Sequence, residues 1–216
     1  MTELTLYLLR HGESVANAQR RYSARRTDPP LSALGEEQAR RQGEALRVAQ
    51  FTAILVSPLL RARQTAEIVS RGMGPRPVVC NALIEVDVGI LDGENVDDPQ
   101  GQRVYNEVIT GWEQGQEDVG FPGGETLHDV RRRLERLLQV LAPQSGNVLL
   151  VGHSLFFAAL LWLYCENRRP SFREGHMGRG RLAVITRVDG CFRLDSLDVA
   201  PGSCTQESWP TDLFGG

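Results

Sequence analysis

The stretch Leu6-Tyr-Leu-Leu-Arg-His-Gly-Glu-Ser14 decides the fold, because it joins an apolar run directly to a group of polar residues. Its four apolar residues predict a short strand that is covered on both faces, as in a parallel sheet. Arg10 and His11 follow at once, although an arginine is rarely buried without a partner. Gly12 would let a ligand approach the backbone closely. The stretch predicts an anion site at the end of the strand; the alternative is a core strand that ends in a solvated Arg-His pair.

The rest of the chain alternates strands with helices. We expect strands at residues 53–56, 78–84 and 148–151, helices at 32–50, 58–71, 104–112, 125–141 and from 154 onward, and a hairpin of strands 182–188 and 191–199 around Asp189-Gly190. This order predicts an α/β three-layer sandwich: a mainly parallel central sheet with one antiparallel edge hairpin and helices on both faces. We expect one domain over residues 1–200, with residues 89–124 as a lid or specificity insertion, and a C-terminal tail at 201–216.

Three of the predicted strands end in polar or glycine-containing turns, at Arg10-His11-Gly12, Ser57-Pro58 and Gly152-His153-Ser154. Ser57 is expected to cap the following helix, which places Arg61 in the first helical turn. In parallel α/β sheets, ligands bind outside the carboxyl ends of the strands. If these strands are neighbours, His11, Arg61 and His153 meet at one site.

These residue types suit phosphoryl transfer. Arg10 and Arg61 are planar and always charged, so they can clamp phosphoryl oxygens. A neutral His11 can attack phosphorus and form a labile phosphoramidate, while His153 and the two arginines stabilise the charge on the transferring group. Glu85 would protonate the leaving alkoxide and then deprotonate the attacking water. This chemistry needs no metal, and we expect no metal site and no other cofactor.

Composition and charge restrict the classes of partner. The net charge of −3 over 216 residues gives no general attraction to nucleic acid or to an anionic membrane. The apolar run 148–165 is interrupted by Gly152-His153-Ser154, which predicts a strand and a buried helix rather than a membrane span. The opening residues show no secretory signal, so we expect a cytoplasmic protein. Four widely spaced cysteines are expected to be reduced: Cys80, Cys165, Cys191 and Cys204.

Five blocks of the sequence occur in a fixed order. They are Arg10-His-Gly-Glu-Ser14 with Asn17, Ser57-Pro-Leu-Leu-Arg-Ala-Arg-Gln-Thr-Ala66, Leu83-Ile-Glu85 with Gly89, Phe121-Pro-Gly-Gly-Glu-Thr126, and Val151-Gly-His153. Together they resemble the histidine phosphatase (phosphoglycerate mutase-like) superfamily over roughly residues 4–165. The resemblance implies a phosphohistidine intermediate on His11, with Glu85 as proton donor. It also implies that the phosphate is bound by Arg10, Asn17, Arg61 and His153.

The departures from the family pattern concern the substrate. Val86-Asp87-Val88 stands where the cofactor-dependent mutases carry an Arg-His-Tyr run, and the segment after Glu85 is short for a mutase. The chain is therefore more similar to the phosphatase branch, which includes fructose-2,6-bisphosphatases and α-ribazole phosphatases. Ser23-Ala24 stands where mutases carry Thr-Gly. Ser154 follows His153 where small residues are usual; its hydroxyl either hydrogen-bonds the phosphate or, as we favour, caps the helix.

Several residues near these blocks allow more than one interpretation. The candidate phosphate-binding residues are Gly12, Ser14, Asn17, Ser23 and Ser154. Asp87 could face the same side of an extended segment as Glu85. We interpret His128 as structural and His176 as a loop residue that could touch substrate. The arginines between residues 20 and 26 predict a solvated face or, alternatively, a second anion site for a bisphosphate or nucleotide-like substrate.

The sequence favours a metal-independent phosphomonoesterase that acts on a small phosphorylated metabolite through phospho-His11. A cofactor-dependent phosphoglycerate mutase is one alternative, and a non-catalytic protein that binds a phosphorylated ligand is another. The expected partner is a small phosphate monoester, with no nucleic acid and no membrane. Edge strands such as those of the terminal hairpin could pair between the subunits of a homodimer.

Overall fold

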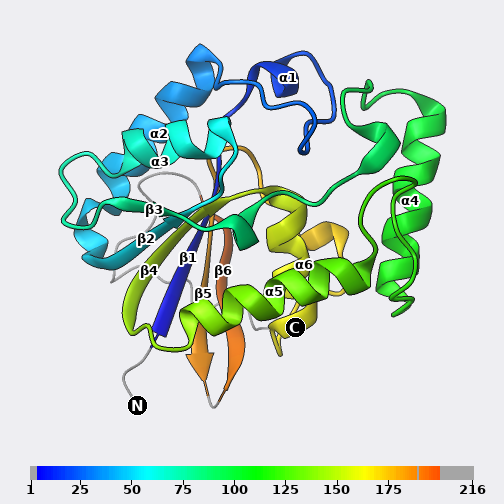
Figure 1. Cartoon of the computed structure of the whole chain (residues 1–216). Helices are drawn as coiled ribbons and strands as arrows, with labels where there is room; N and C mark the ends of the chain where they lie inside the picture. Colours follow the sequence, from blue (N-terminus) through cyan, green and yellow to red (C-terminus); the bar gives the residue numbers. More distant parts are fainter. Residues whose placement is uncertain (1–3, 189, 200–216) are drawn as a thin grey trace.

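Six strands form one sheet in the order β3-β2-β4-β1-β5-β6 in the computed structural model of the chain, which describes residues 4–188 and 190–199 (Figure 1). The strands are β1 (Leu4–Arg10), β2 (Phe51–Val56), β3 (Pro77–Val79), β4 (Gly146–Gly152), β5 (Leu182–Val188) and β6 (Cys191–Val199). Strands β1 to β4 are parallel, whereas β5 is antiparallel to β1 and β6 is antiparallel to β5. The predicted mainly parallel sheet with an antiparallel edge hairpin is confirmed.

Helices cover both faces of this sheet (Figure 1). They are α1 (Val15–Ala18), α2 (Ala33–Leu46), α3 (Leu60–Val69), α4 (Pro99–Glu113), α5 (Leu127–Leu141) and α6 (Ser154–Tyr164). Short 3₁₀ helices lie at Arg47–Ala49, Asn81–Leu83, Gly89–Leu91 and Arg173–Gly175. Helices α2 and α3 pack on one face, and α5 and α6 pack on the other. The three-layer sandwich is therefore the fold of the chain.

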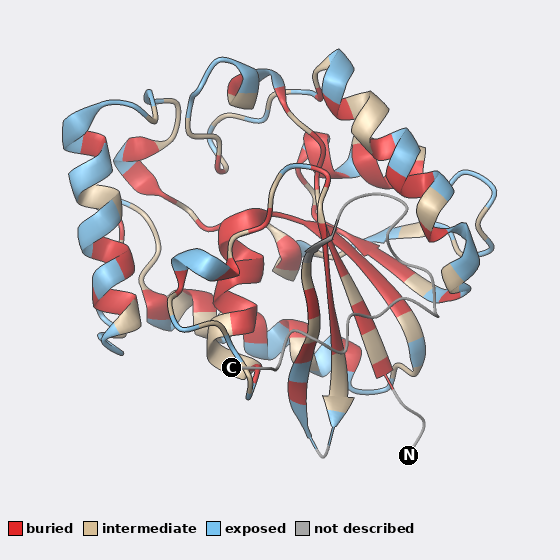
Figure 2. Ribbon diagram, turned by 180° about the vertical axis from the view of Figure 1, so that it is seen from behind, coloured by how far each residue is buried: buried red, intermediate tan, exposed pale blue. Residues whose placement is uncertain are grey.

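The alternation of side chains along the strands builds two cores. Successive side chains of a strand point to opposite faces, so Leu6 and Leu8 of β1 join the core under α5 and α6, whereas Leu9 joins the core under α2 and α3. Figure 2 shows the buried residues along the strands and on the inner sides of the helices. Both faces of the central strands are covered, as the uninterrupted apolar run of β1 predicts.

Helix α5 follows its sequence pattern closely. Thr126 accepts a hydrogen bond from the backbone N–H of Asp129, and the Asp129 carboxylate accepts one from the N–H of Thr126, which forms a capping box. One stripe of the helix is buried: Leu127, Val130, Leu134, Leu137 and Leu141. Helix α6 differs, because its residues 154–161 are buried on all sides. No helix of the described residues has both the length and the apolar character needed to cross a membrane.

The largest differences from the predicted boundaries concern one strand and one helix. The strand predicted at 78–84 ends at Val79, because the chain turns into a 3₁₀ helix that carries Leu83 into the core. The helix predicted from residue 104 begins at Pro99, where Asp98 accepts a hydrogen bond from the N–H of Gly101 and caps it. In the predicted hairpin, Val188 pairs with Cys191. Asp189, Cys204 and the predicted tail at 201–216 lie outside the described residues.

Candidate active site

The carboxyl ends of β1, β2 and β4 lie side by side, because these strands are parallel and β4 stands between the other two. The backbone N–H of His11 donates to Gly152 O (3.0 Å), and that of Ser57 donates to Val151 O (2.9 Å). The rings of His11 and His153 are 5.2 Å apart between centroids. The strand order therefore brings together the polar turns that the sequence places far apart.

His11 is held as a neutral ring with a defined tautomer. Its Nδ1 lies 2.6 Å from the carbonyl oxygen of Gly12, and its Nε2 accepts a hydrogen bond from Nε of Arg61 (3.2 Å). An Nε2 that accepts leaves the ring proton on Nδ1, which then donates to Gly12. Burial lowers the pKa of His11 well below its usual value, and the charges of Arg61 and Arg10 lower it further. The nitrogen with a lone pair is thus Nε2.

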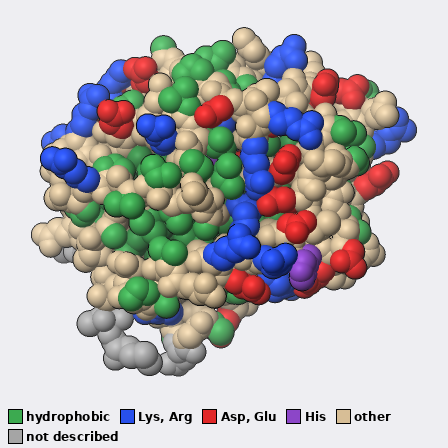
Figure 3. Space-filling model, in the orientation of Figure 1, with side chains coloured by type: hydrophobic (Ala, Val, Ile, Leu, Met, Phe, Trp, Pro, Cys, Tyr) green, Lys and Arg blue, Asp and Glu red, His purple; other side chains and the backbone are tan. Residues whose placement is uncertain are grey.

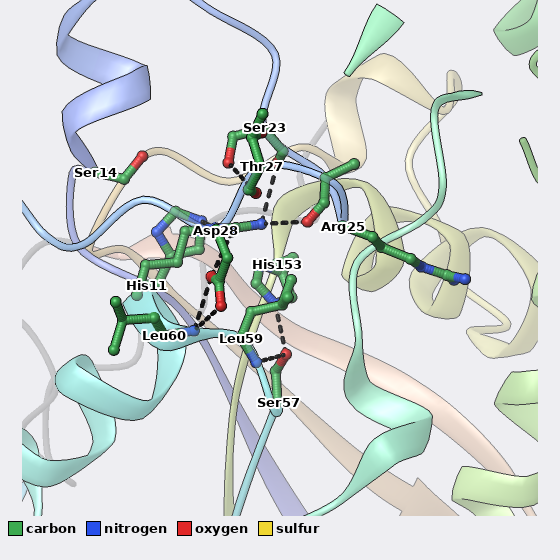
Figure 4. A network of polar contacts seen from close by, with 12 residues as sticks. His11, Ser14, Ser23, Arg25, Thr27, Asp28, Ser57, Leu59, Leu60 and His153 are labelled. Atoms are coloured by element: carbon green, nitrogen blue, oxygen red, sulfur yellow. Dashed lines mark hydrogen bonds and ion pairs between the residues drawn. The ribbon is translucent and has the colours of Figure 1, made fainter. Parts of the chain in front are cut away.

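Arg61 lies in the first turn of α3 and is 1 % exposed. Its Nη2 donates to the carbonyl oxygens of Ser23 and Ala24, both at 3.0 Å, and its Nη1 is 3.4 Å from the Asp28 carboxylate. Asp28 also accepts a hydrogen bond from the backbone N–H of Leu60 (2.8 Å), at the start of α3 (Figure 4). Segment 23–28 therefore covers Arg61 and satisfies the free N–H at the start of the helix.

Ser57 does not cap α3, so this prediction is wrong. The helix begins two residues later than Pro58, at Leu60, and its N-cap Leu59 makes no side-chain hydrogen bond. The hydroxyl of Ser57 instead lies 2.7 Å from Nε2 of His153 and accepts a hydrogen bond from the N–H of Leu59 (Figure 4). With Ser57 donating to Nε2, the ring proton of His153 is on Nδ1, a buried atom with no hydrogen-bond partner among the described residues.

Glu85 points its carboxylate at the N-terminus of α6. Its Oε1 accepts hydrogen bonds from the N–H groups of Val86 (2.8 Å) and Phe156 (3.0 Å), and its Oε2 accepts one from Leu155 (3.4 Å). Burial raises the pKa of Glu85, although these donors and Arg61 oppose the shift. Asp87 instead accepts from the N–H of Gly89 in a local turn. Of the two candidate carboxylates, only Glu85 lines the cavity described next.

A cavity of about 290 Å³ opens at this edge of the sheet. Its lining consists of Arg10, Asn17, Arg20, Arg21, Tyr22, Ser23, Ala24, Glu85, Val88, Val96, Tyr105, Ser154, Leu155, His176 and Arg179. His11, Arg61 and His153 are not in this lining, because they are almost fully buried. A phosphoryl group that binds Nε2 of His11 must therefore take the place of the Arg61 Nε–H in front of the lone pair.

Gly12 and Ser14 are candidate phosphate ligands that serve local packing in this structure. A Cβ on Gly12 would overlap the backbone oxygen of Gly35 in α2. The hydroxyl of Ser14 accepts a hydrogen bond from the N–H of Asn17 (3.2 Å) and caps α1. Asn17 Oδ1 accepts in turn from the N–H of Ser14 (3.2 Å), which leaves the amide nitrogen of Asn17 as a donor for an anion.

Ser154 is a cavity residue and does not cap α6, so the favoured interpretation is wrong. The N-cap position belongs to His153, and Ser154 is already helical. The Ser154 hydroxyl lies 3.1 Å from Nδ1 of His176 and 3.3 Å from the carbonyl oxygen of Met177. Nη1 of Arg10 donates to the same carbonyl at 2.5 Å. Ser154 thus faces the loop before β5. Burial lowers the pKa of the neighbouring Arg10 to about 10.

Among the polar residues of the cavity lining, sequence reasoning missed three and left His176 undecided. Tyr22 and Tyr105 stack at 5.9 Å between ring centroids, and Arg179 lines the cavity beside them. His176, whose pKa burial lowers to about 4, is 3.4 Å from the hydroxyl of Tyr105. Because β5 is antiparallel, its beginning lies where the parallel strands end, and this rule could have placed His176 and Arg179. No sequence signal places Tyr105, which comes from α4.

The arginines between residues 20 and 26 are not simply a solvated face. Arg20 forms an ion pair with Asp97, and Arg21 donates to the carbonyl oxygen of Gly93 at 2.7 Å. Arg25 forms an ion pair of 2.7 Å with the largely buried Glu125. These arginines thus connect segment 20–26 to later parts of the chain. Arg20 and Arg21 also line the cavity.

The α/β sandwich and the pairing of two buried histidines with arginines at its carboxyl edge define a phosphoglycerate mutase-like protein. The family model of the histidine phosphatase superfamily (branch 1) matches residues 6–199. The chain belongs to this superfamily. Across residues 4–188 and 190–199, no group of three or more His, Cys, Asp or Glu side chains is placed to hold a metal ion.

Relatives of the chain include both mutases and phosphatases by name. A protein named probable phosphoglycerate mutase GpmB from Salmonella choleraesuis (strain SC-B67) is 34% identical over 192 residues, which cover 86% of this chain and 85% of the relative. A mycobacterial glucosyl-3-phosphoglycerate phosphatase superposes with a TM-score of 0.75 at 27% identity, covering 91% of this chain and 99% of the other. The α-ribazole phosphatase from Shigella flexneri gives a TM-score of 0.72 at 25% identity, with coverages of 90% and 96%.

Proposed function

We propose that the protein is a metal-independent phosphomonoesterase that hydrolyses a small phosphorylated metabolite through a phosphohistidine on His11. The observation that carries this proposal is the state of His11: a buried, neutral ring whose unprotonated Nε2 faces Arg61. A neutral imidazole is a competent nucleophile near neutral pH without an activating base.

In the first half-reaction, Nε2 of His11 attacks phosphorus, so that the N–P bond forms and the P–O bond to the leaving alcohol breaks. Arg10 and Arg61 hold the phosphoryl oxygens, and the Nδ1–H of His153 is the donor left for the same group. Protonated Glu85 gives its proton to the leaving oxygen, and a neutral alcohol departs. The raised pKa of Glu85 favours this protonated form.

In the second half-reaction, water attacks phosphorus and the N–P bond breaks. The electron pair of that bond returns to Nε2 of His11. The carboxylate of Glu85 takes a proton from the attacking water, so that orthophosphate leaves and the acid is regenerated for the next turnover. Besides the N–P bond formed and broken at His11, the proposed cycle uses the proton transfers of Glu85 and the charges of Arg10 and Arg61.

The lining of the cavity supports a substrate with more than one anionic group. Four arginines face it (Arg10, Arg20, Arg21 and Arg179) against one carboxylate, Glu85. Ion pairs with Asp97 and Glu13 balance Arg20 and Arg179, whereas the Arg21 guanidinium donates to the neutral carbonyl of Gly93. A carboxylate or a second phosphate on the substrate would satisfy this charge.

A phosphoglycerate mutase is a second candidate, favoured by the 34% identity to the relative named as one. Against it, Val86 and Val88 are buried apolar residues where the mutases carry part of an Arg-His-Tyr run. A non-catalytic binding protein is disfavoured by the neutral nucleophile and the adjacent acid. A coupled enolase assay with and without 2,3-bisphosphoglycerate separates a mutase from a phosphatase.

The direct test replaces His11 with alanine and measures turnover of p-nitrophenyl phosphate in the presence of a chelator. We expect kcat to fall by at least about 10³-fold, because the nucleophile is lost. His128→Ala is the matched control, since this histidine is exposed on α5. Undiminished turnover by His11→Ala, or loss of wild-type activity in the chelator, would contradict the proposal.

A further inference from the structure

Two arginines and one carboxylate form a largely buried cluster behind Glu85. Glu125 accepts hydrogen bonds from Nε and Nη2 of Arg133, at 2.7 and 2.9 Å, and its Oε2 is 2.7 Å from a guanidinium nitrogen of Arg25. The side chains of Glu125 and Arg133 are only 12% and 11% exposed. Figure 3 shows one face of the molecule, on which basic and acidic side chains gather around α5, the helix that carries Arg133.

The cluster binds the backbone of one short segment, residues 82–87. Nη1 of Arg133 donates to the carbonyl oxygens of Ala82 (3.0 Å) and Ile84 (2.7 Å). Nε of Arg25 donates to the carbonyl oxygen of Glu85 itself (2.8 Å). At the other end of the segment, Glu125 accepts from the N–H of Asp87 through its carboxylate, at 3.1 Å, and donates its own N–H to the carbonyl of Asp87, at 2.9 Å.

These contacts take the place of regular secondary structure. Residues 84–88 belong to neither a helix nor a strand, so ladder hydrogen bonds do not fix the position of Glu85. The guanidinium of Arg133 also lies 4.5 Å from the centroid of the Phe156 ring. Phe156 donates its N–H to the Glu85 carboxylate. Arg133 therefore contacts both the backbone that carries the acid and the residue that holds its carboxylate.

Stability alone is a weak reason for this cluster. Taking charges out of water is costly, and apolar residues of similar volume often serve stability equally well. Burial lowers the pKa of Arg133, which reflects that cost. Arg25 belongs to segment 23–28, whose carbonyl groups bind Arg61. The cluster thus connects the segment that carries Glu85 to segment 23–28, which covers Arg61.

We propose that Glu125 and Arg133 are positioning residues that aim the carboxyl group of Glu85 at the leaving oxygen. This inference rests on the proposed function, in which Glu85 protonates that oxygen. A displaced acid slows the loss of a poor leaving group, such as an alkoxide. It matters little for p-nitrophenolate, which departs without a proton.

The test compares Arg133→Met with the wild type on glycerol phosphate and on p-nitrophenyl phosphate. We expect kcat on glycerol phosphate to fall about 10- to 100-fold, because general acid catalysis is impaired. On p-nitrophenyl phosphate we expect a change below about threefold. In a Glu85→Gln background, Arg133→Met should cause no further loss on glycerol phosphate, because the two changes remove the same contribution.

Arg131→Met is the matched control, because Arg131 lies on the same helix and pairs with Glu117 instead. Its kcat should be unchanged on both substrates. If Arg133→Met does not fold, Arg133→Lys keeps a charge near Glu125 but cannot bridge two carbonyl groups and Glu125 together. It should show the same substrate selectivity to a smaller degree.

The possible outcomes test the positioning role and the proposed function separately. Equal loss on both substrates, or further loss in the Glu85→Gln background, would show a merely structural role and overturn the positioning proposal. A wild-type protein that hydrolyses neither substrate would overturn the proposed function itself.

Discussion

The environment of Glu85 opposes the ionisation of its carboxyl group, and the stability of the fold depends on pH as a result. Its pKa is raised by burial. A raised pKa in the folded state gives a stabilising contribution that is complete below the unfolded pKa and is lost as pH rises through the folded pKa. At neutral pH the ionised carboxylate is therefore less favourable for folding than a neutral side chain of the same shape.

Glu85→Gln should therefore lose activity without losing stability. We expect kcat on an alkyl phosphate to fall by about 10²- to 10⁴-fold, because proton transfer to the leaving group is lost. The free energy of unfolding in urea at pH 7.5 should equal or exceed that of the wild type. A destabilised variant that retains its activity would mean that Glu85 serves the fold rather than the reaction.

At the scale of single residues, the sequence predicts the histidines and arginines of the site better than the hydroxyls. His11, Arg61 and His153 follow strand ends, and the order of parallel strands is enough to bring them together. Ser57 and Ser154 are different, because the partner of a hydroxyl depends on where the next helix begins. That start is set here by Asp28, whose contact with Leu60 spans 32 residues of chain.

Among the elements, the loop after β1 is fixed by a close contact between two glycines. Cβ atoms on Gly12 and Gly35 would overlap the backbone oxygens of Gly35 and Glu13, respectively. In an ordinary helix interior, alanine is more favourable than glycine by about 1 kcal/mol. Here the overlap is with backbone atoms, which cannot rotate away.

Gly35→Ala should therefore destabilise the protein, by about 1–3 kcal/mol, as overpacking does. It should also lower the proposed phosphatase activity, because the loop carries His11. Gly101→Ala in α4 is the control, since its added Cβ would meet neighbours no closer than 3.4 Å. Urea unfolding of both variants measures the difference. A Gly35→Ala variant as stable as the wild type would show that the loop moves freely.

Elements with a long regular pattern are predictable from the sequence, and elements fixed by distant contacts are less so. The apolar stripe of α5 and the apolar runs of β1 and β4 agree with the structure. Strand β3 ends at Val79, although a strand is predicted over 78–84. The chain leaves the sheet there because Leu83 is buried in the core. The Arg25–Glu125–Arg133 cluster joins residues far apart in the chain, and no local pattern indicates it.

The whole molecule buries three neutral histidines at one edge of its sheet. Burial is the main cause of the lowered pKa of His11, His153 and His176. In the unfolded chain each would bind a proton below about pH 6.5. The unfolded state therefore binds more protons than the folded state as pH falls, and stability must decrease.

Between pH 7.5 and pH 5.5, each of these histidines should cost up to about 1.4 kcal/mol of stability, or about 4 kcal/mol for the three together. Carboxylates with lowered pKa values, such as Asp92 and Glu125, lose their contribution only at lower pH. Glu85, whose pKa is raised, acts in the opposite direction as pH falls. The measurement in a Glu85→Gln background therefore isolates the histidines. Urea unfolding at both pH values measures the effect. His176→Gln should reduce the pH dependence by about one third, because one of three buried titrating rings is gone. If stability were equal at the two pH values, the rings would be protonated in the folded protein, and His11 would then lack the lone pair that attack on phosphorus requires.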